Sequence, residues 1–433
     1  MLVIGGGPAG STFSALAAER GWRVTLLEKE HHPRFHIGES LLPLNLPLFR
    51  RLGVLDQIEH IGMLKPGAEF NHEGYPPAVF YFANALEKSH PIAYQVRRSE
   101  FDHVLLKNSA AKGTDVREGV RVTDVEFRSG QTTLVHTMDE AGGGHTWEAR
   151  LVVDASGRDT LLASRFKMKA RNRQHNSAAV FGHFSGVERR SGRDAGNISM
   201  YWFDHGWYWM IPLKDGAMSV GAVCWADYLK SRTKPVDDFL WDTLRLNPLV
   251  AERMKNATLM APALATGNFS YQARRMYGDG YLLIGDAFAF IDPVFSTGVF
   301  LAMKSAELGV EVADDMLRTG DVSVKGNRAA LRRYETTMRR GLRTFSWFIY
   351  RITTPRIRKM FLKPRNVFRM EEGVLSLLSA DIFGDTPVRR PLFMFKLAYY
   401  VLSTLEVRES LAAWRRRRRA WRSRLDFVWK SGT

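Results

Sequence analysis

The sequence predicts an α/β protein in three parts: a βαβ-based domain, an inserted β-sheet domain and a helical C-terminal region. A short apolar strand, a glycine-rich turn, a helix and a second strand follow one another within the first 28 residues. From about residue 177 to 269 apolar and polar residues alternate and aromatic side chains are frequent, which is typical of a half-buried sheet. Beyond about residue 324 the pattern is helical and basic.

The composition is that of an ordinary globular protein. Of its 433 residues, 45% are hydrophobic and 25% are charged, and this length suffices for two or three domains with sizeable cores. The formal net charge of +17 favours an acidic partner, such as nucleic acid, an anionic membrane surface or an acidic carrier protein. We find no signal peptide and no apolar run of the roughly 20 residues that span a bilayer.

The chain has a single cysteine, Cys224, which lies in the apolar run 220–225. One thiol excludes an intrachain disulfide and any metal site built from several cysteines, and it fits a reducing compartment, so we expect a cytoplasmic location. We expect Cys224 to be a buried structural residue rather than a reactive thiol.

The N-terminal turn reads Gly-Gly-Gly-Pro-Ala-Gly and fits the dinucleotide fingerprint G-x-G-x-x-G between a strand and a helix. Gly5 permits the tight turn, Gly7 lets backbone amides approach a pyrophosphate, and Gly10 permits close packing of helix and strand. The helix N-terminus favours the phosphate charge. An acid after the second strand is placed to bind ribose hydroxyls. The predicted cofactor-binding residues are therefore Gly5, Gly7, Ala9, Gly10 and Glu28.

Three further segments resemble motifs of the aromatic-hydroxylase-type flavoproteins. Val96-Arg97-Arg98-Ser99-Glu100-Phe101-Asp102 resembles the helix start at which an arginine contacts the cofactor, which points to Arg98. Gly285-Asp286 resembles the Gly-Asp motif, whose acid meets ribityl and ribose hydroxyls, and residues 154–157 resemble the Asp-Gly motif. The resemblance implies a Rossmann-type FAD-binding domain. Taken singly, Arg98 also suits a surface ion pair and Asp286 a helix cap.

Trp207-Tyr208-Trp209-Met210-Ile211-Pro212 matches W-x-W-x-I-P, the signature of flavin-dependent halogenases. The resemblance implies that the indoles of Trp207 and Trp209 wall the flavin off from the organic substrate. In that family reduced FAD and dioxygen give a flavin hydroperoxide, which oxidises chloride or bromide to hypohalous acid. The alternative is a pair of core tryptophans on one face of a strand.

Three more segments resemble parts of the halogenase site. Pro-Arg-Phe-His-Ile-Gly-Glu-Ser-Leu-Leu-Pro at 33–43 lies near the flavin ring in that family, which points to Ser40. Lys65, in a Lys-x-Gly-x-x-Phe setting, takes the place of the catalytic lysine that delivers the halogen, although a solvated loop lysine is the plainer interpretation. The run 292–298 matches the halide region, where backbone amides of Thr297 and Gly298 at a helix N-terminus hold chloride or bromide.

One position departs from the tryptophan halogenases, which carry a glutamate immediately before Ser-Thr-Gly. This chain has Phe295 there. Halogenases of phenols and pyrroles, which often act on carrier-bound substrates, have a similar Pro-Val-Phe-Ser sequence. The resemblance therefore favours an electron-rich phenol- or pyrrole-like ring over free tryptophan, because the donor group of such a ring supplies reactivity of its own.

We expect a discontinuous FAD-binding domain over residues 1–60, 92–165 and 270–325, with a β-sheet substrate domain at 61–91 and 166–269 and a helical basic region at 326–433. That last region includes the arginine run 415–419, flanked by tryptophans. A solvated surface is its plainest interpretation, followed by docking of an acidic carrier protein and by peripheral contact with an anionic membrane. No nucleic-acid reader motif accompanies the charge.

The favoured function is an FADH2-dependent halogenase supplied by a separate flavin reductase, because no second dinucleotide fingerprint is present. That absence is weak evidence, since single-component aromatic hydroxylases also lack a second Rossmann unit. An aromatic monooxygenase or a prenyl-lipid reductase on the same scaffold is the enzymatic alternative, and such reductases carry a similar tryptophan motif. The non-enzymatic alternative is a flavoprotein scaffold that binds FAD and a carrier protein without turnover.

Overall fold

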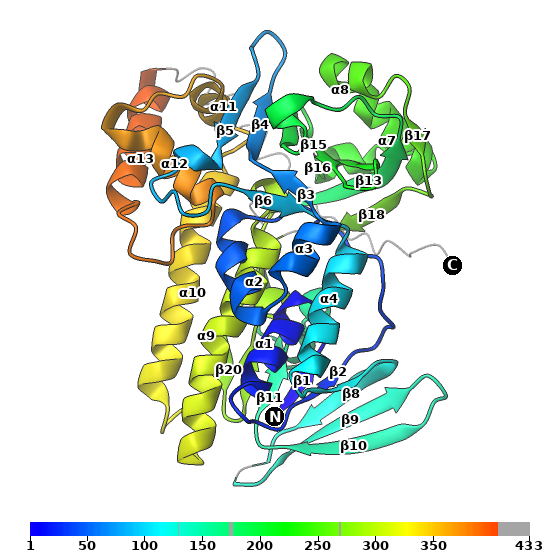
Figure 1. Ribbon diagram of the computed structural model, residues 1–433, viewed down its shortest axis with the longest axis vertical. Helices are drawn as coiled ribbons and strands as arrows, with labels where there is room; N and C mark the ends of the chain where they lie inside the picture. The colour runs from blue at the N-terminus through cyan, green and yellow to red at the C-terminus, as the bar shows by residue number, and fades with distance from the viewer. Residues whose placement is uncertain (129, 173–175, 268–269, 406–433) are drawn as a thin grey trace.

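The computed structural model describes residues 1–128, 130–172, 176–267 and 270–405. A six-stranded sheet carries the N-terminal glycine turn (Figure 1). Its central strand pairs in parallel with a neighbour on each side, Val3 lying opposite Leu26 and Val153. In order across the sheet the strands are β20 (Tyr277–Gly278), β21 (Tyr281–Leu283), β11 (Val152–Asp154), β1 (Leu2–Ile4), β2 (Thr25–Leu27) and β7 (Asp115–Arg117).

Helix α1 (Pro8–Ala18) begins directly after the glycine turn, with proline at its first position, where the missing N–H costs nothing. Ten of its eleven residues are buried, because α4 (Arg98–Ala111) and α9 (Thr297–Thr319) pack against it. This arrangement confirms the predicted Rossmann-type α/β fold. It also brings the first residues of α1 and α9 to one cavity.

A second, eight-stranded sheet lies above the first in Figure 1. Most of its strands are antiparallel, but β4 and β14, which are far apart in sequence, pair in parallel. Every residue of β15 is buried, as expected for a strand covered on both faces. The strands in order are β17 (Thr258–Leu259), β13 (Ser177–Ser185), β16 (Met218–Trp225), β15 (Gly206–Pro212), β14 (Ile198–Phe203), β4 (Gly67–Asn71) and β5 (Ala78–Tyr81), and β18 (Leu264–Gly267) also pairs with β13.

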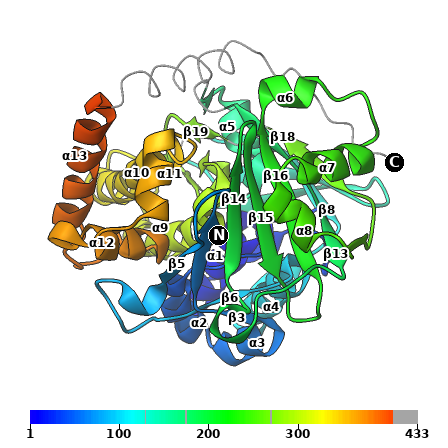
Figure 2. The same cartoon turned by 90° about the horizontal axis from the view of Figure 1, so that it is seen from above.

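Smaller elements connect and cover the two sheets, and α7 and α8 lie beside the larger one in Figure 2. The small sheets are β3 (Met63–Lys65) with β6 (Ala93–Gln95), β8 (Val120–Glu126) with β9 (Thr133–Asp139) and β10 (Gly144–Ala149), and β12 (Lys169–Arg171) with β19 (Tyr271–Ala273) and β22 (Ala289–Phe290). The remaining helices before residue 326 are α2 (Leu46–Leu52), α3 (Leu55–Ile61), α5 (Leu161–Arg165), α6 (Ala226–Lys230), α7 (Val236–Arg245) and α8 (Pro248–Arg253).

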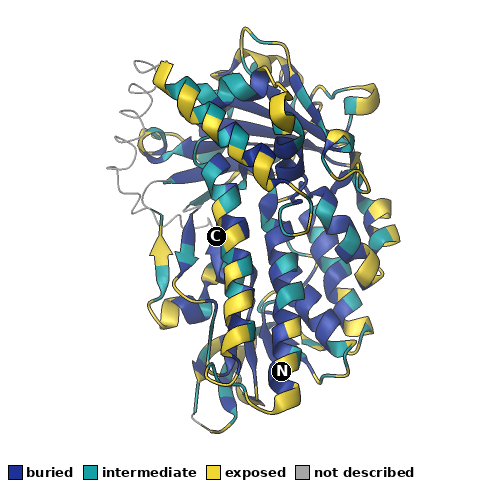
Figure 3. Cartoon of the chain, turned by 90° about the vertical axis from the view of Figure 1, so that its left-hand side faces the viewer, coloured by how far each residue is buried: buried dark blue, intermediate teal, exposed yellow. Residues whose placement is uncertain are grey.

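The C-terminal region is helical as predicted, with α10 (Arg328–Ile349), α11 (Pro355–Leu362), α12 (Met370–Leu378) and α13 (Arg389–Leu405). Figure 3 shows exposed outward faces on these helices over buried strands. The ring of Phe361 on α11 lies against Phe70 of β4, at 4.9 Å between centroids, so this region packs on the larger sheet. The arginine run 415–419 lies outside the described residues. Within the described part of the chain, no helix has the length and apolar character needed to cross a membrane.

The two sheets are formed by different segments of the chain. All strands of the larger sheet fall within 61–91 and 166–269, and all strands of the six-stranded sheet fall within the three predicted FAD-binding segments. The boundaries themselves stay a prediction, since the two sheets share one continuous hydrophobic core.

Candidate functional site

A cavity of about 400 Å³ opens between the glycine turn and the larger sheet. It is lined by residues from both sheets and from the loops between them. Of the predicted site residues, those that line it are Gly5, Gly7, Ala9, Glu28, Ser40, Arg98, Trp207, Trp209, Asp286 and Gly298. Gly10, Lys65 and Thr297 are not among the residues that line it.

The glycine turn packs as tightly as the fingerprint predicts. A Cβ atom on Gly10 would lie 1.9 Å from the carbonyl oxygen of Gly5, and one on Gly5, at φ +105°, would lie 2.5 Å from the carbonyl oxygen of Ala155. Gly7 faces open space, since its nearest neighbour is an Arg34 nitrogen at 3.7 Å. The turn thus leaves room for a phosphate at Gly7, at the N-terminus of α1.

Glu28 is buried at the end of β2 and lines the same end of the cavity. Its Oε2 accepts a hydrogen bond from the backbone amide of Gly6 at 2.6 Å, and its Oε1 accepts one from that of Glu30 at 3.0 Å. The carboxylate therefore holds the glycine turn in place and faces the cavity where a ribose is expected.

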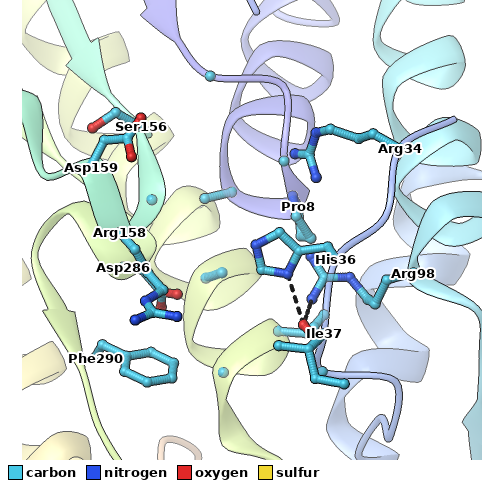
Figure 4. Close-up of a pocket in the computed structure, with 18 of the residues that line it drawn as sticks. Pro8, Arg34, His36, Ile37, Arg98, Ser156, Arg158, Asp159, Asp286 and Phe290 are labelled. Carbon is cyan, nitrogen blue, oxygen red and sulfur yellow. Dashed lines mark hydrogen bonds between the residues drawn. The ribbon is translucent and has the colours of Figure 1, made fainter. Parts of the chain in front are cut away.

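Asp286 follows β21 and points into the cavity beside Arg158 (Figure 4). Burial raises the pKa of Asp286 to about 6, although the nearby charges of Arg158 and Arg98 lower it. A desolvated acid with an open face is suited to accept hydrogen bonds from the hydroxyls of a ligand. It does not act as the cap of a long helix, because only the short 3₁₀ turn Gly285–Ala287 contains it.

Arg98 is part of a buried ion pair as well as of the cavity wall. Its Nε and Nη2 donate to Asp102 at 2.7 and 2.9 Å, and its Nη1 donates to the carbonyl oxygen of Ile37 at 2.9 Å. Burial alone would raise the pKa of Asp102, but the charge and hydrogen bonds of Arg98 hold it below its ordinary value. The guanidinium therefore fixes the loop 33–43 along one side of the cavity.

His36 projects from that loop into the cavity, between Pro8 and Arg98 (Figure 4). Its Nδ1 donates to the carbonyl oxygen of Ile37 at 2.8 Å. Burial, helped by the charge of Arg98, lowers the pKa of His36 to about 4. The ring is therefore neutral near pH 7 and its Nε2 is an acceptor.

These features fit FAD. The glycine turn at the N-terminus of α1 suits a pyrophosphate, the two acids suit ribose and ribityl hydroxyls, and the far end of the cavity is aromatic. The roles assigned to single residues stay predictions.

Trp207 and Trp209 form that aromatic end. They occupy alternate positions on β15, so both indoles lie on one face of the strand, with ring centroids 5.9 Å apart. The Nε1 of Trp209 donates to Ser219 Oγ at 3.2 Å on the neighbouring strand. Both side chains are nearly buried but line the cavity, so they are wall residues as well as core residues.

Gly221 provides the space for the Trp209 indole. The two residues are paired across β15 and β16, and a Cβ atom on Gly221 would lie 2.4 Å from the indole and 2.5 Å from Phe181 Cβ. We expect Gly221→Ala to displace this indole and to destabilise the fold by about 1–3 kcal/mol. For the halogenase that the sequence resembles, the yield of halogenated product per reduced FAD consumed should fall, while the affinity for FAD, followed by flavin fluorescence, should change little. An unchanged yield would contradict the wall role of Trp209.

Lys65 is the last residue of β3 and is 1% exposed, so the interpretation as a solvated loop lysine is wrong. Its Nζ donates to Ser40 Oγ and to the carbonyl oxygen of Leu41, both at 2.9 Å, and lies 5.3 Å from the ring centre of Phe82. Burial lowers the pKa of Lys65 to about 7. Ser40 lines the cavity, so it connects the cavity with the lysine.

The predicted halide segment forms a tight turn before α9. Asp292 accepts a hydrogen bond from the amide of Val294 at 3.2 Å, and Ser296 adopts a left-handed conformation at φ +57°. Gly298 lines the cavity, whereas Thr297 is 1% exposed and lies behind it. Phe295 is not among the residues that line the cavity, and its ring stacks on that of Phe361, with 6.2 Å between ring centroids.

Several lining residues were not among the sequence predictions. Arg34, His36 and Glu39 lie in the segment 33–43, from which only Ser40 was selected, so the signal was present. Arg158 follows the recognised Asp-Gly motif and lies over the ring of Phe290, 5.6 Å from its centre. Gly221 carries no local signal, because its importance depends on the strand pairing.

A sequence profile of the tryptophan halogenase family matches residues 78–363, and one of NAD(P)-binding Rossmann-like domains matches residues 3–40. The chain is 28% identical over 410 residues to a 1H-pyrrole-2-carbonyl-[peptidyl-carrier protein] chlorinase of Pseudomonas fluorescens, covering 89% of each chain. It is 35% identical over 318 residues to a tryptophan 2-halogenase of Chondromyces crocatus, covering 71% of this chain and 59% of that one.

Solved structures show the same fold. A flavoprotein/dehydrogenase from Cytophaga hutchinsonii superposes with a TM-score of 0.85 at 28% identity, over 94% of this chain and 99% of that one. The myxobacterial chondrochloren halogenase CndH, an FAD-dependent enzyme, superposes with a TM-score of 0.75 at 34% identity, over 80% of each chain.

Proposed function

Because this chain belongs to the tryptophan halogenase family and is a flavin-dependent halogenase, we propose that its substrate is a pyrrole- or phenol-like ring on an acyl or peptidyl carrier protein. The alternatives of an aromatic monooxygenase and a prenyl-lipid reductase are not favoured. The observation that carries the substrate proposal is Phe295, which packs on Phe361 where tryptophan halogenases have a glutamate.

When bound and reduced, FAD with dioxygen and halide supplies hypohalous acid. The chain's own residues then have four tasks. The glycine turn, Glu28, Arg98 and Asp286 hold the cofactor. Gly298, with Thr297 behind it, presents backbone amides to the halide at the start of α9.

Trp207 and Trp209 keep the organic ring away from the cofactor, so that only small species pass. Lys65, held behind Ser40 at 2.9 Å, receives the halogen. A neutral amine reacts with hypohalous acid to give an N-halo amine and water, and the halogen then replaces a ring hydrogen and regenerates the N–H group. A charged amine would instead hydrogen-bond hypohalous acid and orient it. A pKa of about 7 makes both forms available.

A carrier protein as partner is supported by the carrier-bound substrate named for the Pseudomonas relative and by the net charge of +17, which attracts an acidic protein. We also propose that a separate flavin reductase supplies reduced FAD. The peripheral membrane contact considered from the sequence gains no support from these relatives.

The test is product analysis by mass spectrometry. Small pyrroles, phenols and tryptophan would be offered as free compounds. Those that carry a carboxyl group would also be offered as thioesters on a carrier protein. Every reaction would contain reduced FAD and dioxygen, with either chloride or bromide. We expect a halogen isotope pattern on a carrier-bound pyrrole or phenol and none on free tryptophan. Halogenated tryptophan would overturn the substrate proposal, and oxygenated product independent of halide would overturn the reaction.

A further inference from the structure

Glu39 lies beside the aromatic end of the cavity, and its side chain is buried there. The backbone from Glu39 to Leu41 runs along β6: Val96 N donates to the carbonyl oxygen of Glu39 at 2.8 Å, and Leu41 N donates to that of Tyr94 at 3.0 Å. Successive side chains of extended backbone point to opposite sides. Ser40 therefore turns to Lys65 and Glu39 turns to the opposite side of this backbone, and both residues contribute to the cavity lining.

One carboxylate oxygen of Glu39 is held by a chain of hydrogen bonds from the larger sheet. Asp215 binds Arg97 Nε at 2.5 Å, and Arg97 Nη1 lies 3.2 Å from His183 Nδ1. A guanidinium only donates, so Nδ1 of His183 is the acceptor and Nε2 carries the proton. That Nε2 donates to Glu39 Oε1 at 2.9 Å.

The other oxygen, Oε2, is buried and has no hydrogen-bond partner within the described part of the chain. Glu39 is 1% exposed, and an unpaired carboxylate oxygen so far from water costs free energy. The aromatic rings nearby cannot satisfy it: Phe35 stacks on Phe181 at 6.2 Å, and Phe181 lies 5.9 Å from Trp209. A donor from a bound ligand is the partner that this position lacks.

We propose that Glu39 is a flavin-binding residue whose Oε2 accepts a hydrogen bond from the imide N–H of the flavin ring. Oxidised isoalloxazine carries no other N–H, so a carboxylate can pair only with this group. The end of the cavity that adjoins Glu39 is the aromatic one, which suits a flat ring system. Asp215, Arg97 and His183 act through Glu39 and are positioning residues.

The negative charge of Glu39 then changes the reduction potential of the bound cofactor. Reduction by two electrons adds negative charge to the ring unless a second proton follows, and a fixed carboxylate beside the ring opposes that charge. The carboxylate therefore weakens the binding of reduced FAD relative to oxidised FAD and lowers the reduction potential of the bound cofactor.

The test is the affinity of the whole chain for oxidised FAD and for FAD reduced by dithionite, with neither halide nor organic substrate present. For Glu39→Gln we expect weaker binding of oxidised FAD and a rise of about tenfold in the affinity for reduced relative to oxidised FAD, seen also as a higher reduction potential. Glu30→Gln is the matched control, because Glu30 lines the cavity at its other end and its side chain is 51% exposed beside Arg34. It should leave the ratio unchanged.

The role of His183 as a positioning residue can be tested by the same ratio of affinities for reduced and oxidised FAD. His183→Gln keeps a donor for Glu39 and should preserve the wild-type ratio, whereas His183→Phe removes the donor and should shift the ratio in the direction of Glu39→Gln. An unchanged ratio and potential in Glu39→Gln would overturn the proposal, as would equal shifts in both glutamate variants. Since no substrate is present, failure here is distinct from failure of the substrate proposal.

Discussion

Replacement of Lys65 by methionine is expected to abolish halogenation and yet to stabilise the protein. Methionine keeps the length and the apolar stem but has no nitrogen to receive halogen, so the rate should fall by at least about a hundredfold. Oxidised FAD should bind as before, because Lys65 lies behind the cavity lining. Product formation by mass spectrometry and flavin fluorescence measure the two effects.

The stabilisation follows from burial of the amine. The pKa of Lys65 is about 7 in the folded protein and 10.5 as its ordinary value, so the unfolded chain binds more protons between pH 7 and 10.5. The wild type therefore gains stability as the pH rises through that window, and below pH 7 it bears the full cost of a buried charge. At pH 6 we expect Lys65→Met to be more stable by about 3 kcal/mol, a difference that disappears towards pH 10.5.

Urea unfolding at several pH values measures this difference. The exposed Lys255 supplies the control, since Lys255→Met should change neither stability nor rate. The haloamine route needs the neutral amine, so wild-type halogenation should also slow as the pH decreases below about 7. Halogenation by Lys65→Met at the wild-type rate would remove Lys65 from the reaction.

The second large effect is expected from Gly10→Ala, which should yield a protein without bound FAD. The added methyl group would lie 1.9 Å from the carbonyl oxygen of Gly5 and 3.3 Å from Ala155 Cβ, and neither the turn nor the buried helix has room to move. The start of α1 must shift, which removes the phosphate site. The loss of stability should be about 3 kcal/mol.

Absorbance of bound flavin and thermal unfolding check this result. Gly7→Ala is the informative comparison: its methyl group meets nothing closer than 3.7 Å, so the fold should be unaffected and only FAD affinity should decrease. Gly144→Ala, on a hairpin with its nearest neighbour at 3.9 Å, should change neither property. Normal FAD binding by Gly10→Ala would show that the turn does not hold the cofactor as described.

Sequence patterns predicted those parts of the molecule whose structure depends on contacts between residues that are close in sequence. The turn from Gly5 to Gly10 is specified by residues that are adjacent in the sequence and contact one another, so its structure can be predicted from the motif. Lys65 could be placed only by resemblance, because its burial and its contact with Ser40 depend on strands β3 and β6, which bring separate segments together. The link from Asp215 through Arg97 and His183 to Glu39 joins four separate segments of the chain by side chains alone, and periodicity carries no information about such contacts.

Cys224 has a consequence for durability. It is the only thiol in the chain, it is 0% exposed near the end of β16, and burial raises its pKa above the ordinary range for a thiol. Hypohalous acid reacts most readily with exposed thiolates, and this chain offers none to the oxidant that it produces. Oxidative wear during repeated turnover should therefore begin at the thioethers of Met138 and Met260, which are 49% and 54% exposed. The number of turnovers before inactivation is then limited by oxidation of these exposed methionines and by loss of reduced cofactor to side reactions.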